Sequence, residues 1–410
     1  MVNKVYLHVG LPKSGTSCLQ AVFAENKDRL RERSGILYPG ATWGDQVLAT
    51  RDLLNANPHG TRDSAVAGAW QRLVDEMHEF DGDSLVSMEW LSSAEPVHVR
   101  RLVETLAPSQ VEVVVTVRDL GRTIPAAWQE FMQNWEQWTW DEFLGAVTSE
   151  TPRATPAGNM FWSQQDLGRL LVIWTEVLPP EQIHVVPVGQ AGATAADLWL
   201  RFASVMSVDG TSFDTSGRGS NESLGLESAE LMLRLNRVSR TGGLDWPVYN
   251  EMFKNALAKR GLSKRKHRER RLYLPAGLEP WVQARTAEHL RAIETSGVSV
   301  VGDLDDLNPR FTAAHDDSPV DAAALLDAAL EGLVALAKDR GEELVRLRAR
   351  VARLRDPQGQ GDGSEPRERL DHALAHPLRF VLIAWSEKHP ALMTARVIYR
   401  RLVTAVRPPA

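Results

Sequence analysis

Short apolar runs alternate with longer segments of helical spacing through most of the chain. The runs are rich in Val, Leu and Ile, as expected of strands that are buried on both faces of a parallel sheet. They cover residues 5–9, 84–88, 111–117 and 183–188. Apolar residues at intervals of three and four predict helices near residues 19–30, 97–106, 167–177, 195–206 and 226–238. This alternation predicts an α/β fold in which a central parallel sheet lies between two layers of helices.

The C-terminal part of the chain has a different pattern. An acidic turn, VVGDLDDLNP, follows the last apolar run, and we place the main α/β domain at residues 1–315. Leucines then recur with a 4-3-4-3 spacing, which predicts a long amphipathic or coiled-coil helix over residues 316–356. Its apolar seam supports two alternatives: a homo-oligomer formed through residues 320–355, or packing of the helix against its own domain.

Two further segments complete the predicted C-terminal extension. Residues 357–369 are rich in Gly, Pro and Gln and predict a flexible linker. Residues 370–410 mix apolar and basic positions, which is typical of a basic amphipathic helix at a membrane surface. Docking of that helix on the protein is the alternative. Because no apolar run approaches the roughly 20 residues needed to span a bilayer, we expect a cytoplasmic protein with peripheral membrane contact at most.

Composition narrows the classes of partner. The 410-residue chain has a net charge of -6 at pH 7, so it has no general attraction to nucleic acid, and we expect no nucleic-acid partner. Any anion must then bind at a local basic site. The single cysteine, Cys18, cannot form an intramolecular disulfide, which favours a reducing compartment. No spacing of His and Cys typical of a metal site occurs, and we expect no metal.

The segment VYLHVGLPKSGTS carries the clearest chemical signal. A strand runs into a glycine-containing loop, and a helix follows, so that main-chain amides and the helix dipole can point at one anion. Lys13 adds a mobile positive charge, and the hydroxyl groups can donate to phosphate oxygens. The residues expected to bind the anion are Gly10, Pro12, Lys13, Ser14, Gly15, Thr16 and Ser17.

The order of residues in this loop distinguishes two nucleotide-binding classes. In nucleoside triphosphatases the lysine follows the second glycine, in the pattern G-x-x-x-x-G-K-[ST]. Here Lys13 precedes Gly15, and the stretch PKSGTS resembles the 5′-phosphosulfate loop of the sulfotransferase superfamily. The resemblance extends over roughly residues 1–310. It implies a P-loop-like three-layer fold and a donor substrate, 3′-phosphoadenosine 5′-phosphosulfate (PAPS).

A second segment, VEVVVTVRDLGRTIPAAWQEF, resembles the 3′-phosphate motif of the same superfamily. In that motif a central strand ends in Arg, here Arg118, and a Ser follows eight residues later at the start of a helix. Open α/β sheets bind ligands at such strand ends, and a guanidinium group can form two hydrogen bonds to a phosphate. The chain departs from the motif at Ala126. Arg122, Thr123 and Gln129 are the candidate substitutes for the missing hydroxyl.

Glu89 follows the run SLVSM, at a place where related enzymes often carry an acidic general base. The resemblance therefore implies that Glu89 removes the proton of the acceptor hydroxyl. His8 and His98 are alternative bases. Residues 264–271, with six Lys or Arg in eight positions, either close over the 3′-phosphate or form a solvated basic face.

The functional expectation is a PAPS-dependent sulfotransferase with Lys13 and Glu89 as catalytic residues. The acceptor is a hydroxyl compound, such as a carbohydrate, a glycolipid or a small metabolite, and its identity is left open. Two alternatives remain: a P-loop-type nucleotide kinase, and a non-catalytic scaffold that binds adenosine phosphates.

Overall fold

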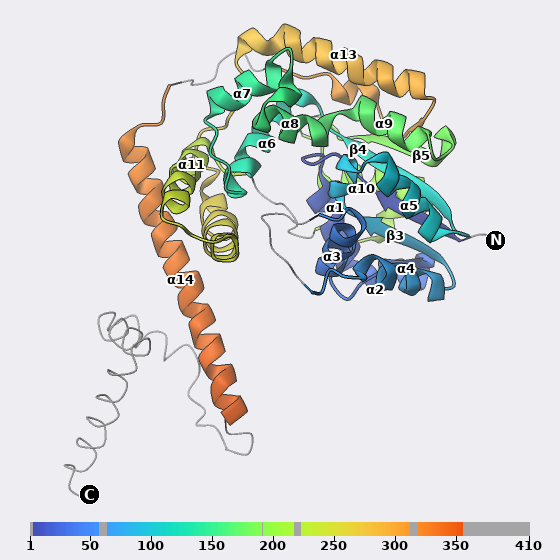
Figure 1. The fold of residues 1–410 in the computed structure, drawn as a ribbon, viewed down its shortest axis with the longest axis horizontal. Helices are drawn as coiled ribbons and strands as arrows, with labels where there is room; N and C mark the ends of the chain where they lie inside the picture. The colour runs from blue at the N-terminus through green and yellow to red at the C-terminus, as the bar shows by residue number, and fades with distance from the viewer. Residues whose placement is uncertain (1–2, 57–63, 191, 217–222, 312–317, 356–410) are drawn as a thin grey trace, which may run out of the picture. The chain divides into compact units, whose positions relative to one another are not determined.

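The computed structural model describes residues 3–56, 64–190, 192–216, 223–311 and 318–355. Within these ranges, six strands form one parallel sheet in the order β2-β3-β1-β4-β5-β6. Figure 1 labels β3, β4 and β5 of this sheet and the helices around it. The strands are β1 Lys4–His8, β2 Ile36–Leu37, β3 Asp83–Ser87, β4 Gln110–Val117, β5 Ile183–Pro187 and β6 Ser299–Val300. The chain moves from β1 to one side of the sheet and then crosses to β4 on its other side. The carboxyl ends of β1 and β4 therefore form the switch point at which open α/β sheets bind ligands.

Alternate residues of the strands pack into two separate apolar clusters, one on each face of the sheet. Val5, Leu7 and Val113 belong to the first cluster, which helices α3, α4, α5, α9 and α13 cover. Tyr6 and Val114 belong to the second, which α1, α2 and α10 cover. Successive strand residues point to opposite faces of the sheet, and helices bury both faces. The fold therefore has the three layers that the sequence predicts: helices, sheet and helices.

The bounds of these helices follow from local signals in the sequence. Gly35 takes φ 65° and ends α2, in the left-handed conformation that glycine commonly supplies at a helix C-terminus. Thr194 caps α10 by accepting a hydrogen bond from the amide of Asp197. The helices are α1 Thr16–Glu25, α2 Lys27–Ser34, α3 Trp43–Leu53, α4 Ala69–Glu79, α5 Pro96–Leu106, α9 Leu167–Thr175, α10 Ala195–Val205 and α13 Glu279–Ser296.

A third apolar cluster lies beyond the carboxyl edge of the sheet and is built from helices and the loops that join them. It includes the buried Trp128 and Trp135. The ring of Trp135 stacks on that of Tyr249, with 4.6 Å between their centroids. Most of its members come from α6 Leu120–Gln133, α7 Trp140–Thr148, α8 Pro156–Gln165, α11 Leu226–Thr241, α12 Trp246–Tyr249 and the π-helix Asn250–Lys259. This cluster matters for function because α6 and the π-helix bring charged side chains to the loop after β1.

The predicted elements agree with the observed ones where the periodic pattern is long. The four predicted strands are confirmed to within one residue at each end, and α5, α9, α10 and α11 begin within one residue of their predicted starts. The prediction of one continuous helix over residues 19–30 is wrong, because α1 ends before Asn26 and α2 begins after it. The side-chain amide of Asn26 donates to Val22 O at 2.9 Å and to Asp214 O at 2.8 Å at this break. Strands β2 and β6 were not predicted, since two residues show no period.

The C-terminal extension begins with α14 Ala322–Arg355, a helix where the leucine spacing predicts one. The chain divides into two compact units at Gly332 and Leu333. Within the first unit, Leu326 and Leu330 of the predicted seam are exposed. Self-association through residues 320–355 remains a prediction. The predicted linker at 357–369 and tail at 370–410 lie outside the described residues. No helix in the described ranges has the length and apolar character required to cross a membrane.

Candidate functional site

The loop after β1 continues the pairing with β4 before it turns. The amides of Val9 and Leu11 donate to Val114 O at 3.0 Å and to Thr116 O at 2.9 Å. The chain then reverses through Lys13 at φ 68° and Gly15 at φ 84°, and α1 begins at Thr16. A non-glycine residue at φ 68° is uncommon. The amides of Lys13, Gly15 and Thr16 donate to no main-chain carbonyl in the described chain, so they remain available to an anion.

Gly10 is required by close packing beneath the loop. A Cβ atom at this position would lie 2.6 Å from Thr116 Oγ1 and 2.7 Å from His8 Nε2. Because neither neighbour belongs to a flexible side chain, the loop can approach the sheet this closely only with glycine. Gly15 is constrained in the same way, since its Cβ would lie 2.4 Å from Leu198 Cδ2 and its φ is positive.

A chain of buried hydrogen bonds supports the loop from the sheet. The hydroxyl of Ser14 donates to Leu11 O at 2.5 Å and lies 2.6 Å from Thr116 Oγ1. Thr116 Oγ1 lies 3.0 Å from His8 Nε2, and His8 Nδ1 lies 2.8 Å from Ser87 Oγ. Burial lowers the pKa of His8 to about 3, so the imidazole is neutral at physiological pH. His8 therefore holds the loop in place and has no ring nitrogen free to act as the alternative base.

The ammonium group of Lys13 forms an ion pair with Glu130 of α6, with 2.7 Å between Nζ and Oε2. The Lys13 side chain is 18% exposed and that of Glu130 is 41% exposed, so the pair lies at the rim of the loop. Burial raises the pKa of Glu130, but the charge and hydrogen bond of Lys13 outweigh it and leave the pKa below its usual value. Glu130 is thus ionised, and it would compete with any anion that approached Lys13.

Glu89 is the second carboxylate that interacts with Lys13. It is partly buried, and its Oε2 accepts a hydrogen bond of 3.0 Å from the side chain of Gln20 in α1. Burial raises the pKa of Glu89, and the negative charge of Glu130 adds to this rise, while Gln20 and Lys13 oppose it. The predicted base and the predicted lysine are therefore close enough to interact. A carboxylate with a raised pKa is a stronger base than an ordinary one.

The π-helix brings two more lysines to this rim. Lys254 donates to Asn134 Oδ1 at 2.5 Å, and burial lowers its pKa to about 8, with repulsion from Lys259 adding to the shift. Much of the Lys259 side chain is exposed, yet loss of water around its ammonium group is the largest cause of its lowered pKa. Each of the two lysines also interacts with Lys13 and Glu130. These lysines and Glu130 are absent from the residues that the sequence predicts for the site.

The geometry of the π-helix explains why the two lysines were missed. Its hydrogen bonds join residues five apart, as between Arg260 N and Asn255 O at 3.1 Å. Residues five apart therefore lie one turn above each other, whereas an α-helical pattern places them on different faces. For Glu130 the available signal was its place on the helix after Arg118, one turn beyond Ala126. Only the packing of α6 shows that it faces the loop.

The second predicted motif occupies the end of β4 and the start of α6. Arg118 follows the last residue of β4, and burial lowers its pKa to about 10, with repulsion from Arg122 adding to the shift and attraction to Asp119 opposing it. In the described chain its guanidinium group forms no ion pair within 4.0 Å. Arg122 differs, because its Nε binds Asp119 Oδ2 and one of its terminal nitrogens donates to Gly189 O at 3.0 Å.

The three candidate substitutes for the missing hydroxyl at Ala126 differ in what they can offer. Thr123 and Gln129 are 1% and 6% exposed, and Ala126 itself is 6% exposed. The hydroxyl of Thr123 faces Arg118 O at 3.5 Å. Arg122 is committed to Asp119 and to the 188–189 main chain. Arg118 is therefore the side chain of this motif that is best placed to bind a ligand.

The remaining predicted features lie elsewhere. His98 Nδ1 accepts a hydrogen bond from Glu95 N in the cap of α5, which gives it a structural role. In the basic run 264–271, Arg265 pairs with Glu269 at 2.8 Å and Arg270 with Glu227 at 2.8 Å. Arg268 also approaches a carboxylate at 3.5 Å, so at least three basic residues of the run take part in ion pairs. No group of three or more His, Cys, Asp or Glu suited to a metal occurs among the described residues.

Comparison with known proteins finds a distant structural likeness. No family model matches the chain, and no curated protein matches it. Among solved structures, a sulfotransferase from Alicyclobacillus acidocaldarius aligns with 61% of this chain and 100% of its own, at 14% sequence identity and a TM-score of 0.37. A likeness this distant carries no argument about family or activity. The class that the coordinates themselves define is an open, parallel α/β fold with a polar site at its switch point.

Proposed function

We propose that this protein is a sulfotransferase that moves a sulfuryl group from PAPS to the hydroxyl group of an acceptor. The observation that carries the proposal is the loop PKSGTS between β1 and α1, whose lysine pairs with Glu130 and also interacts with Glu89, an acidic residue with a raised pKa. Gly10 and Gly15 allow the main chain to curl, and the amides of Lys13, Gly15 and Thr16 are available to an anion.

The reaction would break one bond and form another at sulfur. The acceptor oxygen attacks the sulfur of the donor, and its proton passes to Glu89. The bond between sulfur and the bridging oxygen breaks, and 3′-phosphoadenosine 5′-phosphate leaves with that oxygen. Lys13 stabilises the negative charge that develops there, as preorganised donors do in other group transfers. Because a phosphate is already a good leaving group, the residues at this rim suffice for the step.

Two carboxylates near Lys13 are candidates for the base, and their environments separate them. Glu130 is held by Lys13 at 2.7 Å, which lowers its pKa and makes it the weaker base. Glu89 has a raised pKa and one carboxylate oxygen bound to Gln20. We therefore assign proton removal to Glu89, and assign to Glu130 the role of balancing the charge of Lys13 before the donor binds.

The adenosine end of the donor would lie toward β4. Arg118 is the proposed ligand of the 3′-phosphate, because its guanidinium group stands at the strand end without an ion pair in the described chain. Arg122 supports it indirectly, since it fixes Asp119 at the start of α6. Lys254 and Lys259 add positive charge near Lys13.

The environment of Asp119 also bears on the kinase alternative. A P-loop kinase needs a carboxylate near the end of such a strand to hold its magnesium ion. Asp119 is 2% exposed, and each of its oxygens accepts a hydrogen bond from Arg122: Oδ1 from the amide, at 2.9 Å, and Oδ2 from Nε. Because both oxygens of Asp119 are bound to Arg122, this carboxylate is poorly placed to hold a magnesium ion. We therefore favour sulfuryl transfer over the kinase alternative.

The proposal is tested by binding and by turnover. Calorimetry of the whole chain should detect binding of 3′-phosphoadenosine 5′-phosphate and much weaker binding of ATP. Lys13→Ala should reduce sulfate transfer from labelled PAPS to a panel of hydroxyl compounds by roughly 10²-fold or more. Lys4→Ala is the matched control, because Lys4 lies at the amino end of β1 and pairs with Glu112 at 3.2 Å. Near-normal turnover in Lys13→Ala contradicts the mechanism, and binding without turnover of any acceptor supports a scaffold.

A further inference from the structure

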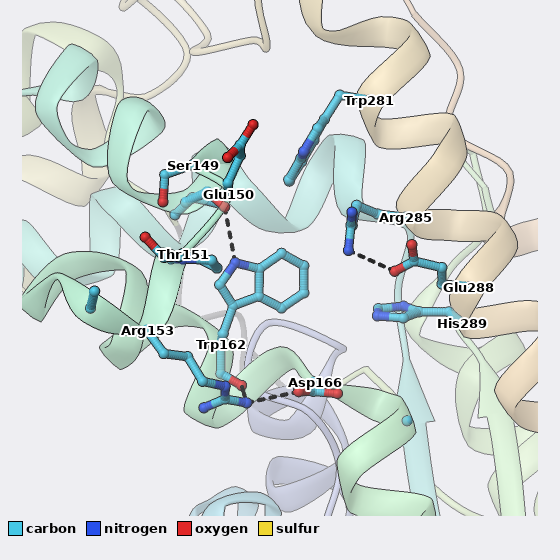
Figure 2. Close-up of a pocket in the computed structure, with 14 residues that line it drawn as sticks. Ser149, Glu150, Thr151, Arg153, Trp162, Asp166, Trp281, Arg285, Glu288 and His289 are labelled. Carbon is cyan, nitrogen blue, oxygen red and sulfur yellow. Dashed lines mark hydrogen bonds and ion pairs between the residues drawn. The ribbon is translucent and has the colours of Figure 1, made fainter.

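A cavity whose lining includes no residue of the loop after β1 lies between α13 and the α7–α9 segment. Its volume is about 510 Å³, which is within the range of small-molecule sites. One wall is a single face of α13, from which Trp281, Arg285 and His289 point inward at a spacing of four residues (Figure 2). The opposite wall holds Trp162 of α8 and residues 149–154.

The charged residues of this cavity are largely neutralised by one another. Arg153 pairs with Asp166 at 2.7 Å, and Arg285 pairs with Glu288 at 2.8 Å (Figure 2). Glu150 is the remaining charged residue of the lining, and it is exposed. The cavity therefore offers no net positive charge to an anion, and it differs in this respect from the lysine-rich rim of the loop after β1.

His289 is the buried polar group that points into the cavity. The residue is 9% exposed, and in the described chain neither of its ring nitrogens has a hydrogen-bond partner. Burial lowers the pKa of His289 to about 4, so its ring carries one N–H donor and one acceptor nitrogen at physiological pH. The Nε of Arg285 is a second buried donor without a partner. A ligand with hydroxyl groups can satisfy both residues, because a hydroxyl both donates and accepts.

The two indole rings restrict the shape of the ligand. Trp162 is fixed by a hydrogen bond of 3.0 Å from its Nε1 to Val147 O. The ring of Trp281 stands 6.3 Å from it between centroids, with an angle of 65° between the ring planes. A flat base could stack on only one of two planes set at this angle. A puckered ring with apolar C–H groups on several sides can contact both.

We propose that this cavity binds a neutral saccharide, with its C–H groups on Trp162 and Trp281 and its hydroxyl groups on His289 and Arg285. The site is separate from the loop after β1 and does not depend on the activity proposed for that loop. Its contacts are an apolar wall with a few directed polar groups, which is the usual composition of a small-molecule site.

The test uses saturation-transfer NMR on the whole chain with neutral trisaccharides of glucose, mannose and N-acetylglucosamine, and with adenosine. We expect at least one trisaccharide to bind at millimolar concentration. Trp281→Ala should weaken that binding by roughly tenfold or more, as loss of a central aromatic contact does elsewhere. Ala154→Trp should block the cavity, and because Ala154 is exposed this change leaves the core unaltered.

The controls separate this site from the rest of the protein. Trp90→Ala removes an exposed tryptophan that does not line the cavity, and it should leave saccharide binding unchanged. Lys13→Ala should also leave it unchanged, so that failure of the proposed sulfotransferase activity and failure of this inference remain distinguishable. Binding of adenosine alone, no binding of any trisaccharide, or saccharide binding that survives Ala154→Trp would each overturn the proposal.

Discussion

Neutralising Glu130 should strengthen nucleotide binding, although the residue contacts the proposed catalytic lysine. The carboxylate of Glu130 lies 2.7 Å from Lys13 Nζ. A phosphate oxygen that binds the same ammonium group at a distance of about 2.8 Å comes within about 6 Å of that carboxylate. Two like charges at this separation repel by about 0.7 kcal/mol in water and by about 3 kcal/mol at an effective dielectric constant of about 20.

The exposure of Glu130 decides where in this range the effect falls. Its side chain is 41% exposed, so solvent screens the repulsion and a value toward the lower half is expected. We expect Glu130→Gln to bind 3′-phosphoadenosine 5′-phosphate roughly tenfold more tightly than the unaltered chain, which corresponds to about 1.4 kcal/mol. The gain should shrink at about 1 M salt, where the Debye length is about 3 Å.

Calorimetric titration of both proteins at low and high salt measures this directly. Glu181→Gln is the matched control, because Glu181 is exposed and precedes β5 at the amino edge of the sheet, opposite the loop. It makes the same change of net charge and should leave affinity unaltered. Weaker binding in Glu130→Gln would refute the reasoning, and would mean that Glu130 orders Lys13 for the ligand instead of competing with it.

Three further predictions concern acid–base chemistry and packing. Glu89→Gln should lower kcat by roughly 10²- to 10⁴-fold while the nucleotide still binds. In the unaltered chain the rate should rise with pH as Glu89 loses its proton. Because the pKa of Glu89 is raised, this rise should occur above the ordinary pH range of a glutamate. The KM for PAPS should increase as pH passes about 8, because Lys254 loses its charge there, and Lys254→Gln should abolish this alkaline limb. Gly10→Ala should lower stability by about 1–3 kcal/mol, measured by urea unfolding, because the new Cβ would lie 2.6 Å from Thr116 Oγ1.

Each of these predictions has a result that would contradict it. An unchanged acid limb in Glu89→Gln would show that another group accepts the proton. An alkaline limb that persists in Lys254→Gln would assign the titration elsewhere, with Lys259 as the next group to examine. If Gly10→Ala unfolds at the same urea concentration as the unaltered chain, the contact with Thr116 is not a constraint.

Acid unfolding provides a separate check on the support beneath the loop. The pKa of His8 is about 3 in the folded chain and about 6.5 in an unfolded one, so the unfolded state binds the proton first. The stabilising effect is complete above about pH 6.5 and declines as the pH falls toward about 3, by up to about 1.4 kcal/mol per pH unit. Replacing His8 with Gln should flatten this decline in equilibrium unfolding. An unaltered slope would place the acid sensitivity elsewhere, with buried His289 the first candidate.

Local sequence signals determined most of the sheet and the conformation of the loop after β1. The strands around Leu7, Val86, Val114 and Val185 were predictable because each is an apolar run bounded by polar or turn residues, and such runs have few other stable arrangements. The loop was predictable because Gly10, Lys13 and Gly15 act within a few residues of one another. Its left-handed turns and the helix that follows are properties of neighbouring residues.

Tertiary packing decided the charges around that loop. Glu130 and Lys254 are distant from Lys13 in sequence, and they face it only because α6 and the π-helix pack together beyond the carboxyl edge of the sheet. Tertiary packing also decided the role of Arg122. The sequence places it among the candidate phosphate ligands, but in the folded chain its Nε donates to Asp119 Oδ2. Periodicity reports which side of an element is buried, but it does not report which distant side chain meets it there. The sequence by itself therefore determined the strand, loop and helix at which we propose that an anion binds, whereas only the folded chain decided which charged groups surround that loop.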